Sequence, residues 1–385
     1  VESIQISKGP GSVVNGYEGI SGSINTELKK PYATDKEKFF INLYGSNSGR
    51  YEGNLNIAHK FNEKLSTILF THTSIAQKKL DHNHDNFLDM PLSENYIFMN
   101  RWNYSSGNIH EAQAGIKMVF SDLQGGQTIF DPDKAHTIEN GYGVGIDTRR
   151  VEGFLKNGFV FLRPNTSIGI VLDGSYHQQK SFFGLDNYDA EEHFVHLNII
   201  GQTFLFNTNH TIKGGASVLN NNLDETYQSV HYTRNEVVPG IFAEYNYNVN
   251  DKFNLLAGYR VDFHNLYGTF TSPRVHVKYT FTPNTTLRAS AGKAYRVADV
   301  LAENTSILTS ARQFVVEENL LPEQAWNYGL TFIQSFETYS RRGIITLDIY
   351  RTDFINQVVI DVDKDAHGIY VRNLNGVSFS NVMQT

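Results

Sequence analysis

The sequence contains no cysteine, only 4 Met, and no long apolar run among its 385 residues. Without cysteine the chain can form neither a disulfide nor a thiolate metal site, which is compatible with an oxidising envelope. No apolar run approaches the ~18 residues of a transmembrane helix, and no helical period of 3.6 residues is sustained. The net charge of −7 provides no basic surface for nucleic acid. These absences argue against a disulfide scaffold, a helical membrane protein and a nucleic-acid partner.

Aromatic residues, by contrast, make up 13% of the chain, with 21 Tyr and 26 Phe. Several segments alternate apolar and polar residues with the period of a β-strand. One such segment has the apolar set Phe253, Leu255, Ala257, Tyr259, Val261 and Phe263, and another has Val275, Val277, Tyr279 and Phe281. These runs span about 10–13 residues, as tilted membrane strands do, against ~5–6 for ordinary strands. The sequence therefore predicts an all-β fold whose apolar rows face outward.

The connections between these strands alternate between short turns and longer loops. We predict short turns at 61–64, 105–108, 162–166, 206–208, 248–251, 282–285 and 336–341. We predict longer connections at 76–96, 121–147, 178–191, 219–236, 265–271 and 297–322. Short turns on one rim and long loops on the other are typical of an outer-membrane β-barrel. About fifteen antiparallel strands fit between residues 38 and 354, against 22 in a closed, plugged transporter, so we expect an incomplete transmembrane barrel.

The first 31 residues combine strand-like alternation with turn-forming Gly and Pro. They resemble the end of the plug domain of TonB-dependent outer-membrane receptors at Val1, Ile4, Ile6, Lys8, Gly9, Pro10, Ser12, Gly16, Gly22, Ile24, Asn25, Lys29 and Pro31. The resemblance implies that residues 1–34 are the C-terminal end of a plug domain, followed by a transmembrane β-barrel over 35–385 that is truncated before closure. Because the chain begins with Val and shows no signal peptide, we expect an interior fragment of a longer receptor.

A second stretch resembles the mid-barrel region of the same family. It comprises Ser272–Val275, Thr286–Ser290, Gly292–Arg296 and Leu321–Glu323. The sequence departs from the family pattern where Val297-Ala298 replaces Ala-Pro. Haem-type receptors usually carry a His in the loop that follows, and residues 297–320 contain none. This departure argues against haem as the ligand.

The resemblance implies energy-coupled uptake of a scarce solute across the outer membrane of a Gram-negative bacterium. The expected ligand is a small chelate, either an iron–siderophore or a cobalamin-like compound, with haem and copper as further possibilities. The expected partners are outer-membrane lipid and TonB, which would bind a segment upstream of residue 1, and we expect a monomer. The alternatives are a passive porin, a structural barrel and a soluble all-β binding module. We expect no enzyme, because the carboxylate pairs Asp131–Asp133 and Glu191–Glu192 lie in predicted loops that do not desolvate them.

The segment 81–89 has the oxygen spacing of an incomplete EF-hand-like loop. Its candidate calcium ligands are Asp81, Asn83, Asp85, the Phe87 carbonyl and Asp89. Position 12 is Leu92, so the bidentate Glu of such loops is missing. The alternatives are a solvated acidic loop and transition-metal capture by His82 and His84. No cofactor is required by this interpretation beyond the possible Ca²⁺.

Charged and polar residues on the inward side of the predicted strands form a second group of candidates. They are Arg260, Asp262, His276, Lys278 and Arg288. The lumen of a wide barrel is wet and touches the plug, so charges are expected there. We interpret these residues as lumen lining or plug contacts, with ligand contact as the alternative.

Overall fold

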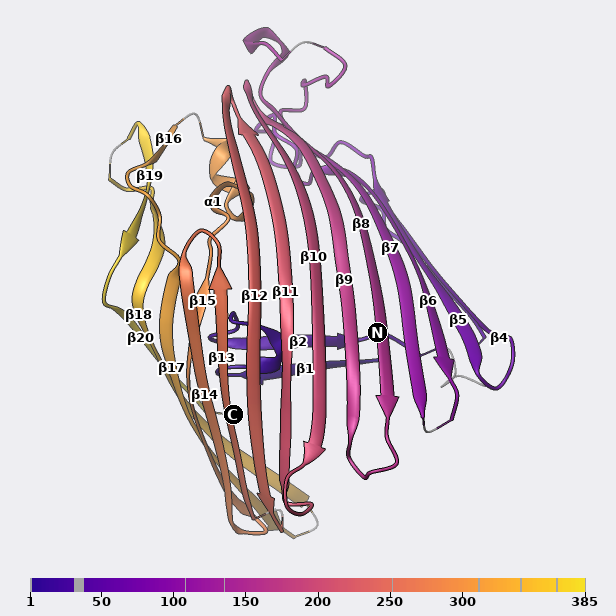
Figure 1. Ribbon diagram of the computed structural model, residues 1–385. Coiled ribbons are helices and arrows are strands. Elements are labelled where there is room, and N and C mark those ends of the chain that lie inside the picture. Colours follow the sequence, from indigo (N-terminus) through magenta and orange to yellow (C-terminus); the bar gives the residue numbers. More distant parts are fainter. Residues whose placement is uncertain are drawn as a thin grey trace.

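The computed structural model describes residues 2–30, 38–107, 109–134, 136–250, 252–310, 312–339, 341–364 and 366–384. Almost all of the regular structure in these residues is β-strand (Figure 1). The strands are β1 (Ser3–Lys8), β2 (Gly22–Glu27), β3 (Phe39–Gly45), β4 (Arg50–Lys60), β5 (Leu65–Ala76), β6 (Leu92–Ser105), β7 (His110–Gly126), β8 (Gly143–Val160), β9 (Ser167–Phe183), β10 (Asp186–Phe204), β11 (His210–Tyr227), β12 (Val230–Val249), β13 (Phe253–His264), β14 (Gly268–Thr282), β15 (Thr285–Arg296), β16 (Gln313–Val316), β17 (Glu323–Thr338), β18 (Arg341–Asp361), β19 (Gly368–Leu374) and β20 (Val377–Gln384). The short helices are η1 (Val13–Asn15), η2 (Ile138–Asn140), α1 (Val300–Glu303) and η3 (Thr305–Thr309).

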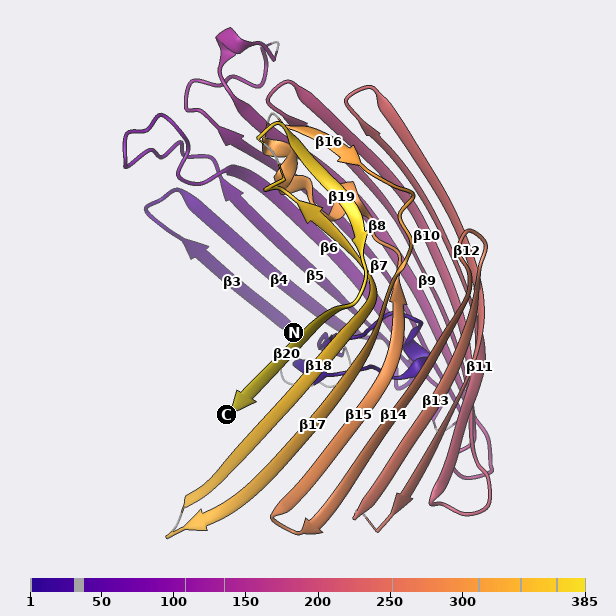
Figure 2. The same ribbon diagram turned by 90° about the vertical axis from the view of Figure 1, so that its left-hand side faces the viewer.

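The wall of the molecule is one curved antiparallel sheet. Its sixteen strands in the described residues are β3 to β15, β17, β18 and β20, each paired with its neighbours in that order. Within the described residues no registered pairing joins β3 to β20, and the wall is open between them (Figure 2). This arrangement confirms the predicted all-β, incomplete antiparallel barrel of about fifteen strands.

The two rims differ as predicted, with short turns at one end of the wall and most of the longer connections at the other (Figure 1). Three of the predicted long loops are nevertheless wrong. Over 265–271, only residues 265–267 connect β13 to β14. Instead of looping over 178–191, the chain stays in β9 to Phe183 and resumes in β10 at Asp186. Instead of looping over 219–236, it stays in β11 to Tyr227 and resumes in β12 at Val230. Although polar residues are frequent there, they alternate with buried inward side chains, so the strand period continues above the membrane band.

The alternation along each strand separates an outer apolar face from an inner polar face. On β13, Tyr259 and Phe263 are exposed on the outside, whereas Arg260 and Asp262 are buried inside. Leu255 pairs with Val277 of β14, so the outward row continues across the two strands. A strand with charged residues on its buried side and aromatic residues on its exposed side is suited to lipid rather than to water.

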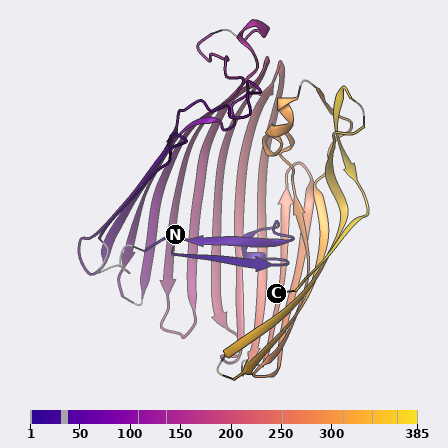
Figure 3. The same cartoon turned by 180° about the vertical axis from the view of Figure 1, so that it is seen from behind.

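The first two strands form a hairpin that crosses the interior of the wall (Figures 1 and 3). β1 pairs with β2 from Ser3 opposite Glu27 to Lys8 opposite Gly22. Residues 9–21 connect the two strands, and η1 within this connection packs against β12, β13 and β14. Val1, Pro31 and the predicted boundary between residues 34 and 35 lie outside the described residues.

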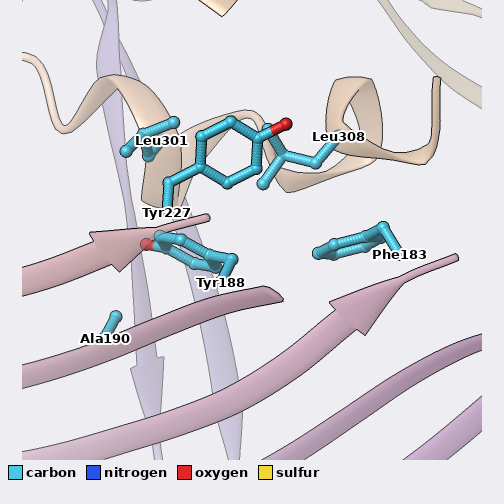
Figure 4. Close-up of a cluster of buried hydrophobic side chains, with 6 residues drawn as sticks. All are labelled: Phe183, Tyr188, Ala190, Tyr227, Leu301 and Leu308. Atoms are coloured by element: carbon cyan, nitrogen blue, oxygen red, sulfur yellow. The ribbon is translucent and has the colours of Figure 1, made fainter. Parts of the chain in front are cut away.

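The long connection between β15 and β17 covers part of the loop-side mouth. Leu301 of α1 and Leu308 of η3 pack with Phe183, Tyr188, Ala190 and Tyr227 of the opposite wall (Figure 4). β16 pairs in parallel with β19, which also pairs with the upper end of β18. None of the helices in the described part of the chain is long and apolar enough to cross a membrane.

Candidate functional site

The turn that connects β1 to β2 has a backbone that requires glycine. Gly9, Gly16 and Gly22 have φ of 80°, 115° and 156°, a region that other L-residues rarely adopt. A Cβ on Gly22 would also lie 2.4 Å from the Ser7 carbonyl oxygen. Ser12 accepts a hydrogen bond from Val14 N at 3.2 Å and donates one to Glu244 of β12 at 2.6 Å. The predicted plug residues thus shape this turn and attach it to the wall.

Arg274 of β14 holds the same turn through its backbone. Its guanidinium donates to five carbonyl oxygens, those of Gly11 (3.2 Å), Ser12 (2.9 Å), Gly16 (3.2 Å), Tyr17 (3.1 Å) and Glu18 (2.7 Å). The side chain is buried. All five bonds come from Nη1 and Nη2, whose N–H groups lie in one fixed plane. This planar group suits a ring of carbonyls that a Lys could not satisfy.

Arg260 and Asp262 of β13 form a buried pair beside this turn. Arg260 contacts both carboxylate oxygens at 2.6–2.9 Å, donates to Ser217 Oγ at 2.6 Å and reaches the Val13 carbonyl at 3.4 Å. Because a buried charge is costly unless it is paired, the two residues depend on each other. Of these two predicted lumen residues, Arg260 contacts the turn directly and Asp262 contacts Arg260.

Glycines of the wall make room for the turn. A Cβ on Gly258 would lie 2.7 Å from Val13 Cγ2, and a Cβ on Gly292 would lie 2.7 Å from Pro10 Cβ. Any larger residue at either position would have to push the turn inward. The wall and the turn are thus matched in shape as well as in hydrogen bonding.

A cavity of about 420 Å³ lies on the short-turn side of the hairpin. Lys8 forms an ion pair with Asp348 of β18 at 2.7 Å across it. The other three predicted lumen residues, His276, Lys278 and Arg288, line the same cavity. Asn25, the remaining predicted plug residue, donates an exposed hydrogen bond to Gln5 at 3.4 Å.

A second cavity, of about 290 Å³, lies on the loop side of the turn. We call it the upper cavity. It is lined by Asn15–Glu18 of the turn and by side chains of the facing wall, which include Glu192, His196, Asn221, Arg234, Glu236, Arg260 and Asp299. Arg234 lies between Glu236, at 3.0 Å, and Asp299, with which it is in direct contact. Burial raises the pKa of Asp299, and the Arg234 guanidinium opposes that shift.

A third cavity, of about 600 Å³, continues toward the mouth beneath α1. We call it the mouth cavity. Aromatic and aliphatic side chains line most of it, and the charged residues Glu225, Arg234 and Glu318 line the remainder together with polar side chains. Arg234 borders both this cavity and the upper cavity. Together the two provide a largely preformed space of the size that small-molecule ligands occupy, roughly 300–1,000 Å³.

The 81–89 loop uses its carboxylates to order its own backbone. Asp81 accepts hydrogen bonds from the N–H groups of Asp85 and Asn86, and Asp85 accepts one from Phe87 N. His82 contacts Asp89 at 2.5 Å and holds the pKa of that carboxyl below its usual value. In the described part of the chain, no three His, Cys, Asp or Glu side chains are grouped so that they could hold a metal ion. The calcium site therefore stays a prediction.

Several site residues were missed by the sequence analysis. Arg274 and Glu244 contact the turn, Asp348 pairs with Lys8, and Arg234 with Asp299 borders both loop-side cavities. The alternation of its strand, which places Arg274 on the inward-facing side, was a signal that could have identified this residue. The carbonyls that Arg274 contacts could not be predicted, because they lie more than 250 residues away in sequence.

Comparisons with known proteins agree with this geometry. The family described as TonB dependent receptor-like, beta-barrel matches residues 14–381. The chain belongs to this family. Members of the TonB-dependent receptor family are transport receptors of the Gram-negative outer membrane, not enzymes. No curated protein matches the sequence.

Solved receptors of similar shape share little sequence with this TonB-dependent receptor. The siderophore receptor PirA from Pseudomonas aeruginosa is 13% identical, with a TM-score of 0.73 over 99% of this chain and 68% of that one. A mutant of the ferric enterobactin receptor PfeA from the same organism is 12% identical, with a TM-score of 0.74 over 99% of this chain and 63% of that one. The alcaligin receptor FauA from Bordetella pertussis is 12% identical, with a TM-score of 0.68 over 98% and 62%. The chain thus spans about two thirds of these receptors, and the likeness shows the fold.

Proposed function

We propose that the receptor to which this chain belongs imports a ferric siderophore or a chelate of similar size, with energy supplied through TonB. The observation that carries the proposal is the position of the turn between β1 and β2 against the inner face of the wall, which we call its seat. It lies between a cavity on the loop side and another on the short-turn side. A solute bound above the turn can pass only if the turn shifts.

The contacts that hold the turn are suited to such a shift. Lys8–Asp348, Ser12–Glu244 and the Arg274 contacts are hydrogen bonds and ion pairs to polar or backbone atoms. Water can replace such contacts at a small net cost each, about 0.5–3 kcal/mol. Force applied through β1 would reach Lys8, the last residue of that strand, and then the turn that follows it.

The test is iron uptake by cells that lack their own siderophore receptors and produce the full-length receptor. We expect saturable uptake of radiolabelled ferric siderophore that a protonophore abolishes. A passive porin would instead give uptake that rises linearly with concentration and is insensitive to the protonophore. That second result would contradict the proposal.

A further inference from the structure

Negative charge is concentrated at one rim of the molecule. The longer connections of the loop side, 77–91, 127–142, 297–322 and 362–367, contain 12 Asp and Glu residues against 5 Lys and Arg residues. In the rest of the chain the charges balance, with 28 acidic residues (Asp and Glu) and 28 basic residues (Lys and Arg). The whole net charge of −7 therefore resides where a ligand would arrive. A rim of one sign attracts solutes of the opposite sign and repels those of its own.

The upper cavity has the same sign. Four carboxylates line it, from Glu18, Glu192, Glu236 and Asp299, against the two guanidiniums of Arg234 and Arg260. Both guanidiniums are already paired with carboxylates, Arg260 with Asp262 and Arg234 with its two neighbours. Glu18 lines the cavity and forms no ion pair within the described residues. Desolvation raises its pKa to about 7, so this carboxyl is partly charged at neutral pH. Glu192 pairs with Arg150 at 3.8 Å, so Glu18 is the one carboxylate of the cavity without an ion pair in the described residues. Neither lining guanidinium is unpaired and available to an anion.

Hydrogen-bonding capacity points in the same direction. The amide of Asn221 lines the upper cavity, and this residue is 91% buried. Its Oδ1 accepts no hydrogen bond from the described residues. A buried acceptor without a partner favours a ligand that brings N–H or O–H donors.

We infer that this receptor selects neutral or cationic chelates, of the ferric trihydroxamate kind, and discriminates against polyanionic chelates such as ferric tris-catecholates. The inference rests on the proposed function and specifies its substrate class. Three hydroxamates balance the charge of Fe³⁺, whereas three catecholates leave a complex with three negative charges. The trianion would have to enter past an acidic rim into a cavity with no free guanidinium. Because like charges repel, we expect the cavity to bind the tris-catecholate more weakly than the trihydroxamate.

The experiment measures binding of three ferric chelates of similar size to the detergent-purified full-length receptor. The probes are a neutral trihydroxamate, a trihydroxamate with one free amine, and a tris-catecholate. We expect the first two to bind and the tris-catecholate to bind at least tenfold more weakly. Added salt should weaken the cationic probe and strengthen the anionic one, because it screens the rim.

Neutralising variants test whether the cavity carboxylates cause the discrimination. The double change Glu18→Gln/Glu192→Gln should reduce the difference in affinity between the trihydroxamates and the tris-catecholate. The control is Glu337→Gln, which alters an exposed residue at the short-turn rim that pairs with Arg342. It should leave the difference in affinity unchanged. Equal or tighter binding of the tris-catecholate by the unaltered receptor would overturn the charge selection while leaving chelate uptake intact. Absence of binding and uptake for all three probes would overturn the proposed function, and this inference with it.

Discussion

At the scale of single residues, the seat of the plug turn depends on a few buried polar side chains. Arg274 binds five carbonyls of residues 11–18, and Arg260 is neutralised by Asp262. The predicted strand register placed Arg260, Asp262 and Arg274 on the inner side, and they are buried there. Their partners could not be predicted, since strand parity fixes the side a residue faces but not what lies opposite it in the lumen.

Replacement of Arg274 should loosen the turn without unfolding the wall. In Arg274→Lys, one ammonium cannot satisfy five carbonyls, and we expect a loss of roughly 2–5 kcal/mol in the stability of the seated turn. Limited proteolysis of the receptor in detergent should then cut within residues 2–30 while the barrel strands stay protected. The control Arg342→Lys alters an exposed ion pair, which is worth about 0–1 kcal/mol. Equal protection of the turn in both variants would contradict the role of Arg274.

At the scale of elements, alternation predicted the strands well and their ends poorly. β13 spans Phe253–His264, because an apolar residue recurs at every second position from Phe253 to Phe263. The ends of β9 to β12 were misplaced, since polar residues there resemble a loop by composition. Those strands extend because the segment 297–310 covers them, and its Leu301 and Leu308 bury Tyr188 and Tyr227. Such a long-range contact leaves no local signal.

The two faces of β13 should respond differently to charge. Leu255→Lys places a charge on the lipid side, which should cost roughly 2–4 kcal/mol if it lies at mid-membrane. Asn254→Lys, one residue away, points into the short-turn-side cavity and should have little effect. Folding of the full-length receptor into lipid vesicles measures the difference. Equal tolerance of both substitutions would show that the faces are assigned the wrong way round.

The 81–89 loop should bind Ca²⁺ weakly. The Asp81 and Asp85 carboxylates already accept backbone N–H bonds, and the Glu of a complete loop is missing. We expect affinity on the order of 10⁻⁴–10⁻³ M, lost in Asp81→Ala/Asp85→Ala without loss of the barrel. Calorimetry on the full-length receptor is the measurement. No heat at millimolar calcium, or Zn²⁺ binding that His82→Ala/His84→Ala removes, would replace calcium with one of the alternatives.

At the scale of the whole molecule, the alternation of turns and loops was enough to predict an incomplete barrel, and the assignment of residues 1–34 to the end of a plug domain stays a prediction. The position of the turn in the lumen required the structure, because it follows from contacts between residues 8–21 and strands β12 to β18. The three cavities, and the charge that lines the upper one, follow from that position. The proposed transport and its proposed selectivity therefore both depend on the position of the turn against the wall.

The absence of cysteine allows a direct test of whether the turn must leave its seat. The Cβ position at Gly258 lies 3.4 Å from Val13 Cβ, close to the separation of about 3.5–4.5 Å found in disulfides. In a full-length receptor with Val13→Cys/Gly258→Cys and no other cysteine, oxidation should fix the turn to β13. We predict that energy-dependent uptake of ferric chelate stops in the oxidised receptor and returns when a reductant is added. Undiminished uptake by a receptor whose disulfide has formed would contradict the account.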